Sequence, residues 1–198
     1  MVTQIQGMGD PLSMAIGSGL VGSTYVVVGA SGILAPLGRS LFRVREGEGH
    51  PFRVGISRGS RLAEGDWDRR FALDARDPRA VRRMLADLRS DGVGVDVAVG
   101  YAGALSPESW SVLARAAAHA VIVLPSRFAD PLGGEEAAAA WLPTRATTRV
   151  LLGWAGGDGD VRWHTPEEIS RVVADAVLDE RAEPLTVGRV TPWSERPA

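Results

Sequence analysis

The chain has 198 residues, of which 45% are hydrophobic, and its 22 basic and 24 acidic residues give a formal net charge of −2. This length and apolar content suit one domain with a sizeable buried core. The balanced charge leaves no basic stripe that would attract nucleic acid, and the longest apolar runs are too short for a membrane span. We therefore expect neither a nucleic-acid partner nor a membrane.

Three residue types are missing from the sequence: cysteine, lysine and asparagine. The absence of cysteine excludes disulfides and thiolate chemistry and agrees with a cytoplasmic protein. The absence of lysine excludes a P-loop lysine and Schiff-base chemistry. The three histidines, His50, His119 and His164, are far apart in the sequence, so no metal site is expected.

The first 23 residues contain many small residues and no basic residue, so they lack the positive region of a signal peptide. Terminal segments of this composition often pack poorly. We predict a flexible N-terminal extension over residues 1–23 and a single folded domain over residues 24–198.

From residue 24 onwards, short β-branched runs alternate with stretches of helical period. The predicted strands are Tyr25–Val28, Phe52–Ile56, Arg70–Leu73, Val95–Val99, Ala120–Leu124, Arg149–Leu152 and Leu185–Val187. Several are apolar without alternation, which is typical of strands covered on both faces. The pattern predicts an α/β fold: a Rossmann-like, doubly wound parallel sheet in a single domain, with the first strand central.

Three helices between these strands have clear start signals. They are predicted over residues 77–90, 106–120 and 165–180, and begin at Asp77, Ser106 and Thr165, each followed by proline. Thr165 and Glu168 form a capping-box pattern. Only about a dozen residues separate the second and third strands, so we expect that crossover to lack a full helix.

The segment after the first strand, "VVVGASGILAPLG", has Gly29, Gly32 and Ala35 at the spacing of a dinucleotide-binding turn. The glycines permit a tight turn and a close approach of the backbone to a pyrophosphate, and a helix expected to begin here would direct its N–H groups at the phosphates. A strand, turn and helix without a ligand is the alternative.

The second strand ends at "ISRG", which places Ser57 and Arg58 where the adenosine ribose of a dinucleotide would lie. An acidic residue there accepts a hydrogen bond from a ribose hydroxyl, whereas an arginine suits a 2′-phosphate. NADP (as NADPH) is therefore the expected cofactor and NAD the second choice. The alternative is that Arg58 is an ordinary exposed arginine.

Several segments resemble the short-chain dehydrogenase/reductase superfamily, over about residues 24–190. "VVVGASGILA" is similar to its nucleotide loop, "FALDARDP" to its third strand with an adenine-side aspartate, and "DVAVGYAG" to the strand that ends in its N-N-A-G motif. "RVLLGWAGGDGDVRWHTPEEIS" is similar to a stretch in small bacterial members. With the residues argued above, the expected cofactor-binding set is Gly29, Ser31, Gly32, Ile33, Ser57, Arg58, Asp74, Gly100, Ala102 and Gly103.

The chain departs from this family at its catalytic residues, which are Ser, Tyr-x-x-x-Lys and Asn. Neither lysine nor asparagine is present, Tyr25 lies in the first predicted strand, and Tyr101 takes the place of an N-N-A-G asparagine. Ser126 matches the position of the catalytic serine. We expect Tyr101 and Ser126 to be the catalytic residues, with Arg127 supplying the positive charge that lysine supplies in the family.

Each catalytic candidate has an alternative. Tyr101 packing beside the cofactor, without donating a proton, is the alternative for that residue, and His164 is either a second proton donor or a surface residue before a helix cap. Ligands of such sheets bind outside the carboxyl ends of the strands, so the loops expected at the site are 100–103, 125–131 and 153–157.

Two functions follow from these observations. The first is an NADPH-dependent reductase of a small carbonyl or imine substrate with a nonstandard proton donor. The second is a dinucleotide-binding protein without hydride transfer, such as a sensor, an accessory subunit or a non-redox biosynthetic enzyme. The six tryptophans suit a core or a subunit interface, and we expect a homo-oligomer.

Overall fold

A computed structural model describes residues 22–42, 49–59, 62, 66–143, 147–157, 160–179 and 183–197. Almost all of the predicted N-terminal extension, residues 1–21, lies outside these residues. Within them, no helix is long and apolar enough to cross a membrane.

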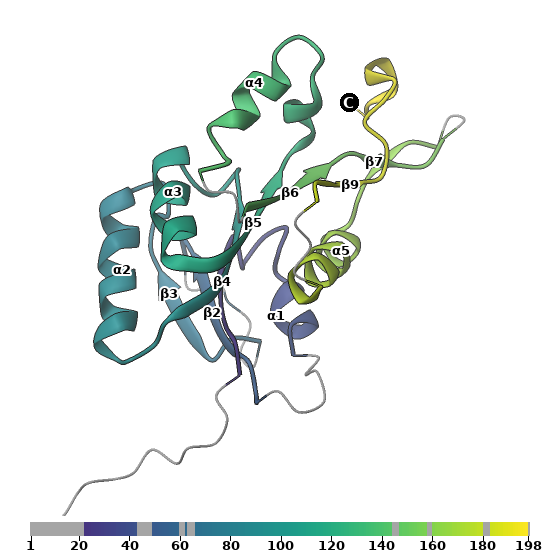
Figure 1. Cartoon of the computed structure of the whole chain (residues 1–198). Coiled ribbons are helices and arrows are strands. Elements are labelled where there is room, and N and C mark those ends of the chain that lie inside the picture. The colour runs from purple at the N-terminus through teal and green to yellow at the C-terminus, as the bar shows by residue number, and fades with distance from the viewer. Residues whose placement is uncertain are drawn as a thin grey trace, which may run out of the picture.

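The described residues form a seven-stranded parallel sheet in the order β3-β2-β1-β4-β5-β6-β9 (Figure 1). Its strands are β1 Thr24–Val28, β2 Phe52–Ser57, β3 Arg69–Ala72, β4 Val95–Tyr101, β5 Ala117–Leu124, β6 Thr147–Leu152 and β9 Leu185–Val187. Val28, the last residue of β1, pairs with Ile56 on one side and Gly100 on the other. The predicted fold is confirmed, and β1 is an interior strand on which the order of strands reverses.

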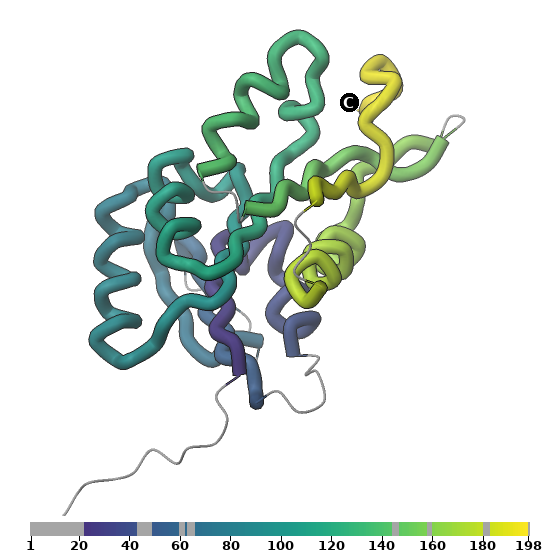
Figure 2. Tube along the Cα trace, viewed as in Figure 1, coloured from purple at the N-terminus to yellow at the C-terminus, as the bar shows by residue number. Residues whose placement is uncertain are grey.

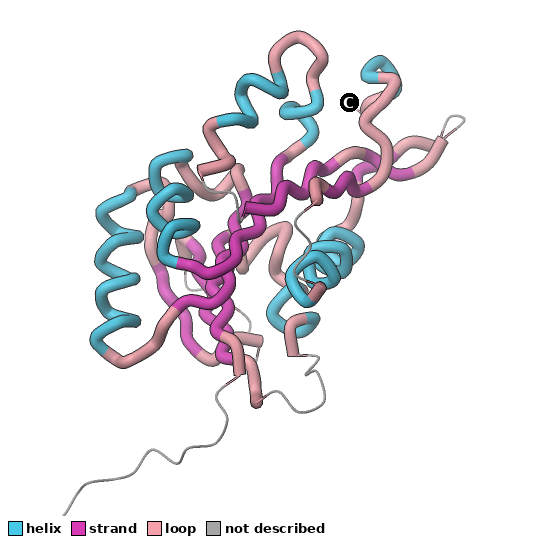
Figure 3. Tube along the Cα trace, in the orientation of Figure 1, coloured by secondary structure: helices cyan, strands magenta, loops and turns pink. Residues whose placement is uncertain are grey.

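Helices cover both faces of the sheet (Figures 1 and 3). Side chains of β1 alternate between two cores: Val26 and Val28 pack with α2 and α3, whereas Tyr25 and Val27 pack with α1 and α5. The helices are α1 Leu37–Ser40, α2 Pro78–Ser90, α3 Pro107–Ala116 and α5 Pro166–Leu178. The predicted caps Asp77, Ser106 and Thr165 each accept a backbone hydrogen bond, and Thr165 and Glu168 complete the capping box.

The predicted end of the helix before β5 is wrong. The helix expected over residues 106–120 ends at Ala116, and β5 begins at Ala117, whose backbone is extended (φ −102°, ψ 150°). Ala117 pairs with Val95 of β4. The alanine-rich segment favours a helix locally, but the ladder with β4 overrides that preference in the folded chain.

The C-terminal part contains short elements that the sequence analysis did not foresee. After β5 come the 3₁₀ turn η1 Ser126–Ala129 and the helix α4 Gly134–Ala139, and after β6 an antiparallel hairpin of β7 Trp154–Ala155 and β8 Arg162–Trp163. The chain after β9 returns along this hairpin, where Trp154 bridges to Arg189, before the turn η2 Trp193–Glu195 (Figure 2).

Among the described residues between β2 and β3 there is no helix, as predicted, and Trp67 fills the space. Its indole lies against two glycines: a Cβ built on Gly55 of β2 would be 2.7 Å from Trp67 Cδ2, and one on Gly38 of α1 would be 3.0 Å from Trp67 Cε2. Trp67 is only 6% exposed. Among the described residues of this connection, Trp67 therefore packs against both β2 and α1.

The chain around Trp67 is fixed by an ion pair with Arg53, a residue of β2 that is 5% exposed. Arg53 Nε and Nη2 donate to the Asp68 carboxylate, each at 3.0 Å, and Nη1 donates to the Gly38 carbonyl at 3.1 Å. Burial raises the pKa of Asp68, but the hydrogen bonds and charge of Arg53 lower it by more, so the net shift is downwards. The arginine thus joins β2, α1 and the segment that leads into β3.

We predict that Trp67→Ala lowers the free energy of unfolding by about 3–5 kcal/mol, because it leaves a cavity between β2 and α1. Chemical denaturation followed by circular dichroism measures the loss. Trp163→Ala is the matched control, because Trp163 is 42% exposed and its truncation leaves no comparable cavity. Equal losses in the two variants would contradict the role of Trp67.

Candidate functional site

A pocket of about 670 Å³ opens at the carboxyl ends of β1, β2, β3 and β4. Its position outside the strand ends, where the strand order reverses, is the usual ligand site of an open α/β sheet. The residues that line it are Val28, Gly29, Ser31, Gly32, Ile33, Ile56, Ser57, Arg58, Gly59, Leu73, Ala75, Tyr101, Gly103 and Ala104.

The first wall of the pocket is the glycine turn after β1. Gly29 has φ +99°, a conformation that favours glycine, and its N–H donates to the Ile56 carbonyl at 3.2 Å. Ser31 and Gly32 are exposed and Ile33 is half-buried. A Cβ built on Gly32 would come no closer than 3.8 Å to any of its neighbours, so the backbone here is open to a ligand.

The helix expected to begin at these glycines does not. Gly32 N donates to Gly29 O at 3.0 Å and Ala35 N to Gly32 O at 2.9 Å, so the segment winds through successive turns (Figure 3). The helix α1 spans only Leu37–Ser40. Pro36 has no N–H, so it cannot make the helical bond to Gly32 O. Phosphate binding by this segment would therefore depend on the N–H groups of the turn and not on a helix dipole.

The second wall is the end of β2, where Ser57 and Arg58 lie as the sequence predicts. Ser57 is buried, and its Oγ donates to the Gly59 carbonyl two residues further on. Arg58 is exposed at the pocket. The Ser57 hydroxyl already donates its proton to the Gly59 carbonyl. Of these two residues, Arg58 is therefore the one whose side chain can donate to an anion in the pocket.

Tyr101, the last residue of β4, lies between two glycines of the pocket. A Cβ built on Gly103 would overlap the Tyr101 ring, at 2.8 Å from Cζ and 3.1 Å from Cδ1, and one on Gly29 would be 3.2 Å from Tyr101 Cβ. The ring therefore packs on the backbone of Gly103, and the two glycines leave the space that it occupies. Tyr101 is half-buried and lines the pocket.

Four predicted site residues lie outside this lining. Asp74 Oδ1 accepts from Arg76 N at 3.1 Å within its own turn. A Cβ on Gly100 would be 2.7 Å from Leu105 Cδ1, so this glycine faces the core. Buried Ala102 donates its N–H to the Val123 carbonyl at 3.0 Å. Ser126 is half-buried at the start of η1.

The ends of β5 and β6, expected at the site, are covered by the chain itself. Arg127 lies over the Phe128 ring, 4.9 Å from its centroid, and does not line the pocket. Gly153 N donates to Val187 O at 2.9 Å, and Trp154 and Arg189 exchange backbone bonds. The lining of the pocket thus comes from the first four strands only.

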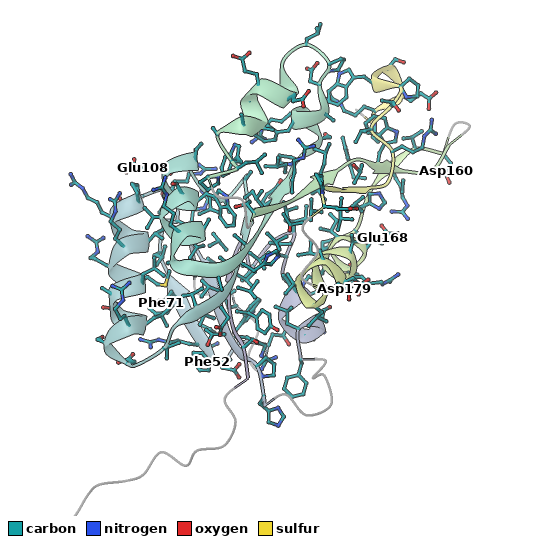
Figure 4. The ribbon with its side chains drawn as sticks, viewed as in Figure 1. Phe52, Phe71, Glu108, Asp160, Glu168 and Asp179 are labelled. Atoms are coloured by element: carbon teal, nitrogen blue, oxygen red, sulfur yellow. The ribbon has the colours of Figure 1, made fainter. Side chains whose placement is uncertain are left out.

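His164 belongs to a separate network at the start of α5 and does not line the pocket. Its Nδ1 lies 3.3 Å from Glu168 Oε2, and Arg162 donates to both carboxylate oxygens of Glu168, at 2.7 and 2.9 Å. Glu168, in the first turn of α5, is labelled in Figure 4. The hydrogen bonds from Arg162, and then that from the Thr165 N–H, hold the pKa of Glu168 far below its usual range. Among the described residues, no group of three acidic or histidine side chains could hold a metal ion.

The sequence analysis missed the third wall of the pocket, which Leu73, Ala75 and Ala104 supply. It also missed Arg76, whose Nη2 donates to the Gly103 carbonyl at 3.0 Å. All four residues follow the end of β3 or of β4, and this position after a strand could have indicated that they lie near the site. The residue types themselves match no binding motif.

Comparisons with solved structures identify the fold. A short chain dehydrogenase from Burkholderia cenocepacia, crystallised in complex with NADP, superposes with a TM-score of 0.60 at 18% identity, over 86% of this chain and 98% of that chain. A β-ketoacyl-[ACP] reductase from Bacteroides thetaiotaomicron gives 0.56 at 16% identity, over 87% and 99%. A short chain dehydrogenase from Leptospira borgpetersenii with bound NAD+ gives 0.53 at 10% identity, over 93% and 98%.

No protein-family model and no curated protein sequence matches the chain. The similarity therefore lies in the three-dimensional structure, and the chain has the fold of the short-chain dehydrogenases and reductases.

We predict that Gly103→Ala lowers the free energy of unfolding by about 1–3 kcal/mol, because the new methyl group overlaps the Tyr101 ring. In a Tyr101→Ala background the same change is expected to cost nearly nothing, because the ring is gone. A double-mutant cycle from denaturation curves measures this coupling. Gly94→Ala is the control, since a Cβ there meets nothing within 4 Å. If Gly103→Ala lowers the free energy of unfolding equally in both backgrounds, the Tyr101 ring is not the reason why residue 103 must be glycine.

Proposed function

We propose that the chain is an NADP(H)-dependent oxidoreductase of the short-chain dehydrogenase/reductase superfamily that reduces a small carbonyl or imine substrate. The observation that carries this proposal is one pocket that joins a glycine turn, an arginine at the end of β2 and a tyrosine at the end of β4. The first two suit a 2′-phosphorylated dinucleotide, and the third is a proton donor beside it.

Different residues of the chain bind the pyrophosphate and the 2′-phosphate of the cofactor in this proposal. The turn from Gly29 to Ile33 presents backbone N–H groups to the pyrophosphate. Arg58 donates to the 2′-phosphate in a charge-assisted contact that NAD(H) cannot make. One neighbour of the same fold was crystallised with NADP and another with NAD+, so the choice of NADP(H) rests on Arg58.

Tyr101 is the proton donor in this proposal. NADPH, when bound, would supply a hydride to the carbonyl or imine carbon, and the Tyr101 phenol would give its proton to the oxygen or nitrogen of the same bond. Packing on Gly103 fixes the plane of the ring, so the hydroxyl has a defined position. Ser126 follows β5, the strand next to β4, and does not line the pocket, so Tyr101 acts in this proposal without it.

A second function is favoured by the ends of β5 and β6. The pocket lining stops at β4, and Ser126 and His164 lie outside it. This arrangement suits a protein that binds the adenosine half of NADP(H) and carries out no hydride transfer, such as a sensor or an accessory subunit. The two functions share the same nucleotide site and differ only in whether substrate-dependent turnover occurs.

We predict that Arg58→Ala weakens NADPH binding by about 10- to 100-fold, because one charge-assisted hydrogen bond contributes about 1.5–3 kcal/mol. NADH binding should change little, since it has no 2′-phosphate. Isothermal titration calorimetry of both cofactors measures the difference. Arg115→Ala, an exposed arginine of α3 away from the pocket, is the control. The same loss for NADPH and NADH would show that Arg58 does not select the phosphate.

We predict that Tyr101→Phe lowers kcat by about 10²- to 10⁴-fold, the usual contribution of a positioned proton donor. NADPH affinity should stay nearly unchanged, because the phenyl ring still packs on Gly103. Stopped-flow oxidation of NADPH with a panel of carbonyl and imine compounds measures kcat, and calorimetry measures affinity. Normal turnover in the variant would exclude Tyr101 as the donor. NADPH binding by the wild type without turnover on any compound would favour the second function.

A further inference from the structure

We infer that Arg76 is a positioning residue for the adenine ring of the bound dinucleotide. Its side chain and its carbonyl join the loop after β3 to the loop after β4, and these two loops form the wall against which the base would lie. The inference rests on the proposed binding of NADP(H), but not on hydride transfer.

The place of the base follows from the places of the other groups. In this kind of sheet the pyrophosphate lies at the glycine turn after β1, and the ribose lies at the end of β2. Beyond these two positions the pocket is lined by Leu73 and Ala75 from the β3 side and by Gly103 and Ala104 from the β4 side. These four residues are small or apolar, so this end suits a flat, uncharged ring and not a phosphate.

The two loops are not joined through the sheet. In the strand order β3-β2-β1-β4, two strands separate β3 from β4, so no ladder of backbone bonds connects their ends. The helices that follow, α2 and α3, pack side by side behind the wall (Figure 1). At the pocket itself, the connection between the loops has to come from side chains.

Arg76 makes this connection in both directions. Its Nη2 donates to the Gly103 carbonyl at 3.0 Å, and its own carbonyl accepts from Ser106 Oγ at 2.9 Å. The Asp74 carboxylate accepts from Arg76 N at 3.1 Å, which fixes the turn that presents the arginine. Both bonds that span the loops therefore involve Arg76.

Gly103 is the residue through which this connection acts on the ligand. The Tyr101 ring packs on the backbone of Gly103, and the Arg76 guanidinium donates to the Gly103 carbonyl. Without the guanidinium, the loop at Gly103 loses one of the hydrogen bonds that hold it. Binding of the base must then order this loop, which costs conformational entropy and weakens affinity. The effect should be the same for every ligand that contains adenosine.

The experiment uses Arg76→Met, which keeps the length of the side chain and removes the donor, and Arg76→Lys, which restores a cationic donor. Arg79→Met is the matched control, because Arg79 is an exposed arginine in the first turn of α2, three residues after Arg76, and the Gly103 carbonyl receives its bond from Arg76. The probes are NADPH, NADH and adenosine 2′,5′-bisphosphate, titrated by calorimetry into the full chain.

We expect Arg76→Met to weaken all three probes by about five- to tenfold, the size of effect expected when one exposed hydrogen bond that orders a binding surface is lost. Arg76→Lys should recover part of the affinity, and Arg79→Met should match the wild type. Arg58→Ala, in contrast, should weaken only the two probes with a 2′-phosphate. Hydrogen exchange in the free protein should become faster at residues 103–106 in Arg76→Met and stay unchanged at residues 29–33, which separates a loosened wall from general destabilisation.

Two results would overturn the inference. Binding of the probes by Arg76→Met as tight as by the wild type would show that the arginine does not position the base, whatever the function of the site. Faster exchange throughout the domain would show that Arg76 acts on stability and not on this wall. A wild-type protein that binds none of the three probes would instead refute the proposed function itself.

Discussion

The packing of the Tyr101 ring on the backbone of Gly103, beside Gly29, is the contact on which the candidate site depends. It joins the ends of β1 and β4, the two strands at which the order of the sheet reverses. A side chain on Gly103 would displace the ring, and Gly29 has in addition a positive φ that favours glycine. These glycines leave space for a protein ring as well as allowing a close approach to a phosphate.

The site lacks the usual catalytic residues of the family that the sequence resembles. Tyr101 stands at the end of β4, where the resemblance implies an asparagine, and the chain contains no lysine that could stand beside a catalytic tyrosine. Between β5 and β6 the described residues form the short elements η1 and α4. Tyr101 is the residue of the predicted catalytic pair that lines the pocket.

A second group of contacts lies next to β2. Trp67 packs against Gly55 of β2 and Gly38 of α1, and Arg53 fixes the chain next to it through Asp68 and the Gly38 carbonyl. The pairing is buried on the arginine side, so removal of Asp68 would leave the charge of Arg53 unpaired in a poorly solvated position. From Arg53 the strand β2 runs on to Ser57, and Arg58 follows at the pocket.

The sequence by itself determined the parallel α/β fold, the caps of the three long helices, the glycine turn after β1 and the place of Arg58 after β2. These features depend on local patterns: the period of apolar residues, a cap residue before proline, and glycines after a strand. It placed the end of α3 at Ala120 and not at Ala116, because the ladder with β4 acts at a distance along the chain and overrides a local helical preference. It could not foresee the length of α1 either, which depends on how Pro36 ends the turns begun at Gly29.

Only the tertiary structure decided which predicted residues meet. Gly100, Ala102 and Asp74 have the right place in the sequence but lie outside the pocket lining, whereas Leu73, Ala75 and Arg76 match no motif and form or support its wall. Strand register sets which face each side chain takes, and loops from strands that are not neighbours in the sheet meet only when the whole domain has folded. Motifs report the chemistry of single segments, and the composition of a pocket is decided where segments distant in sequence come together.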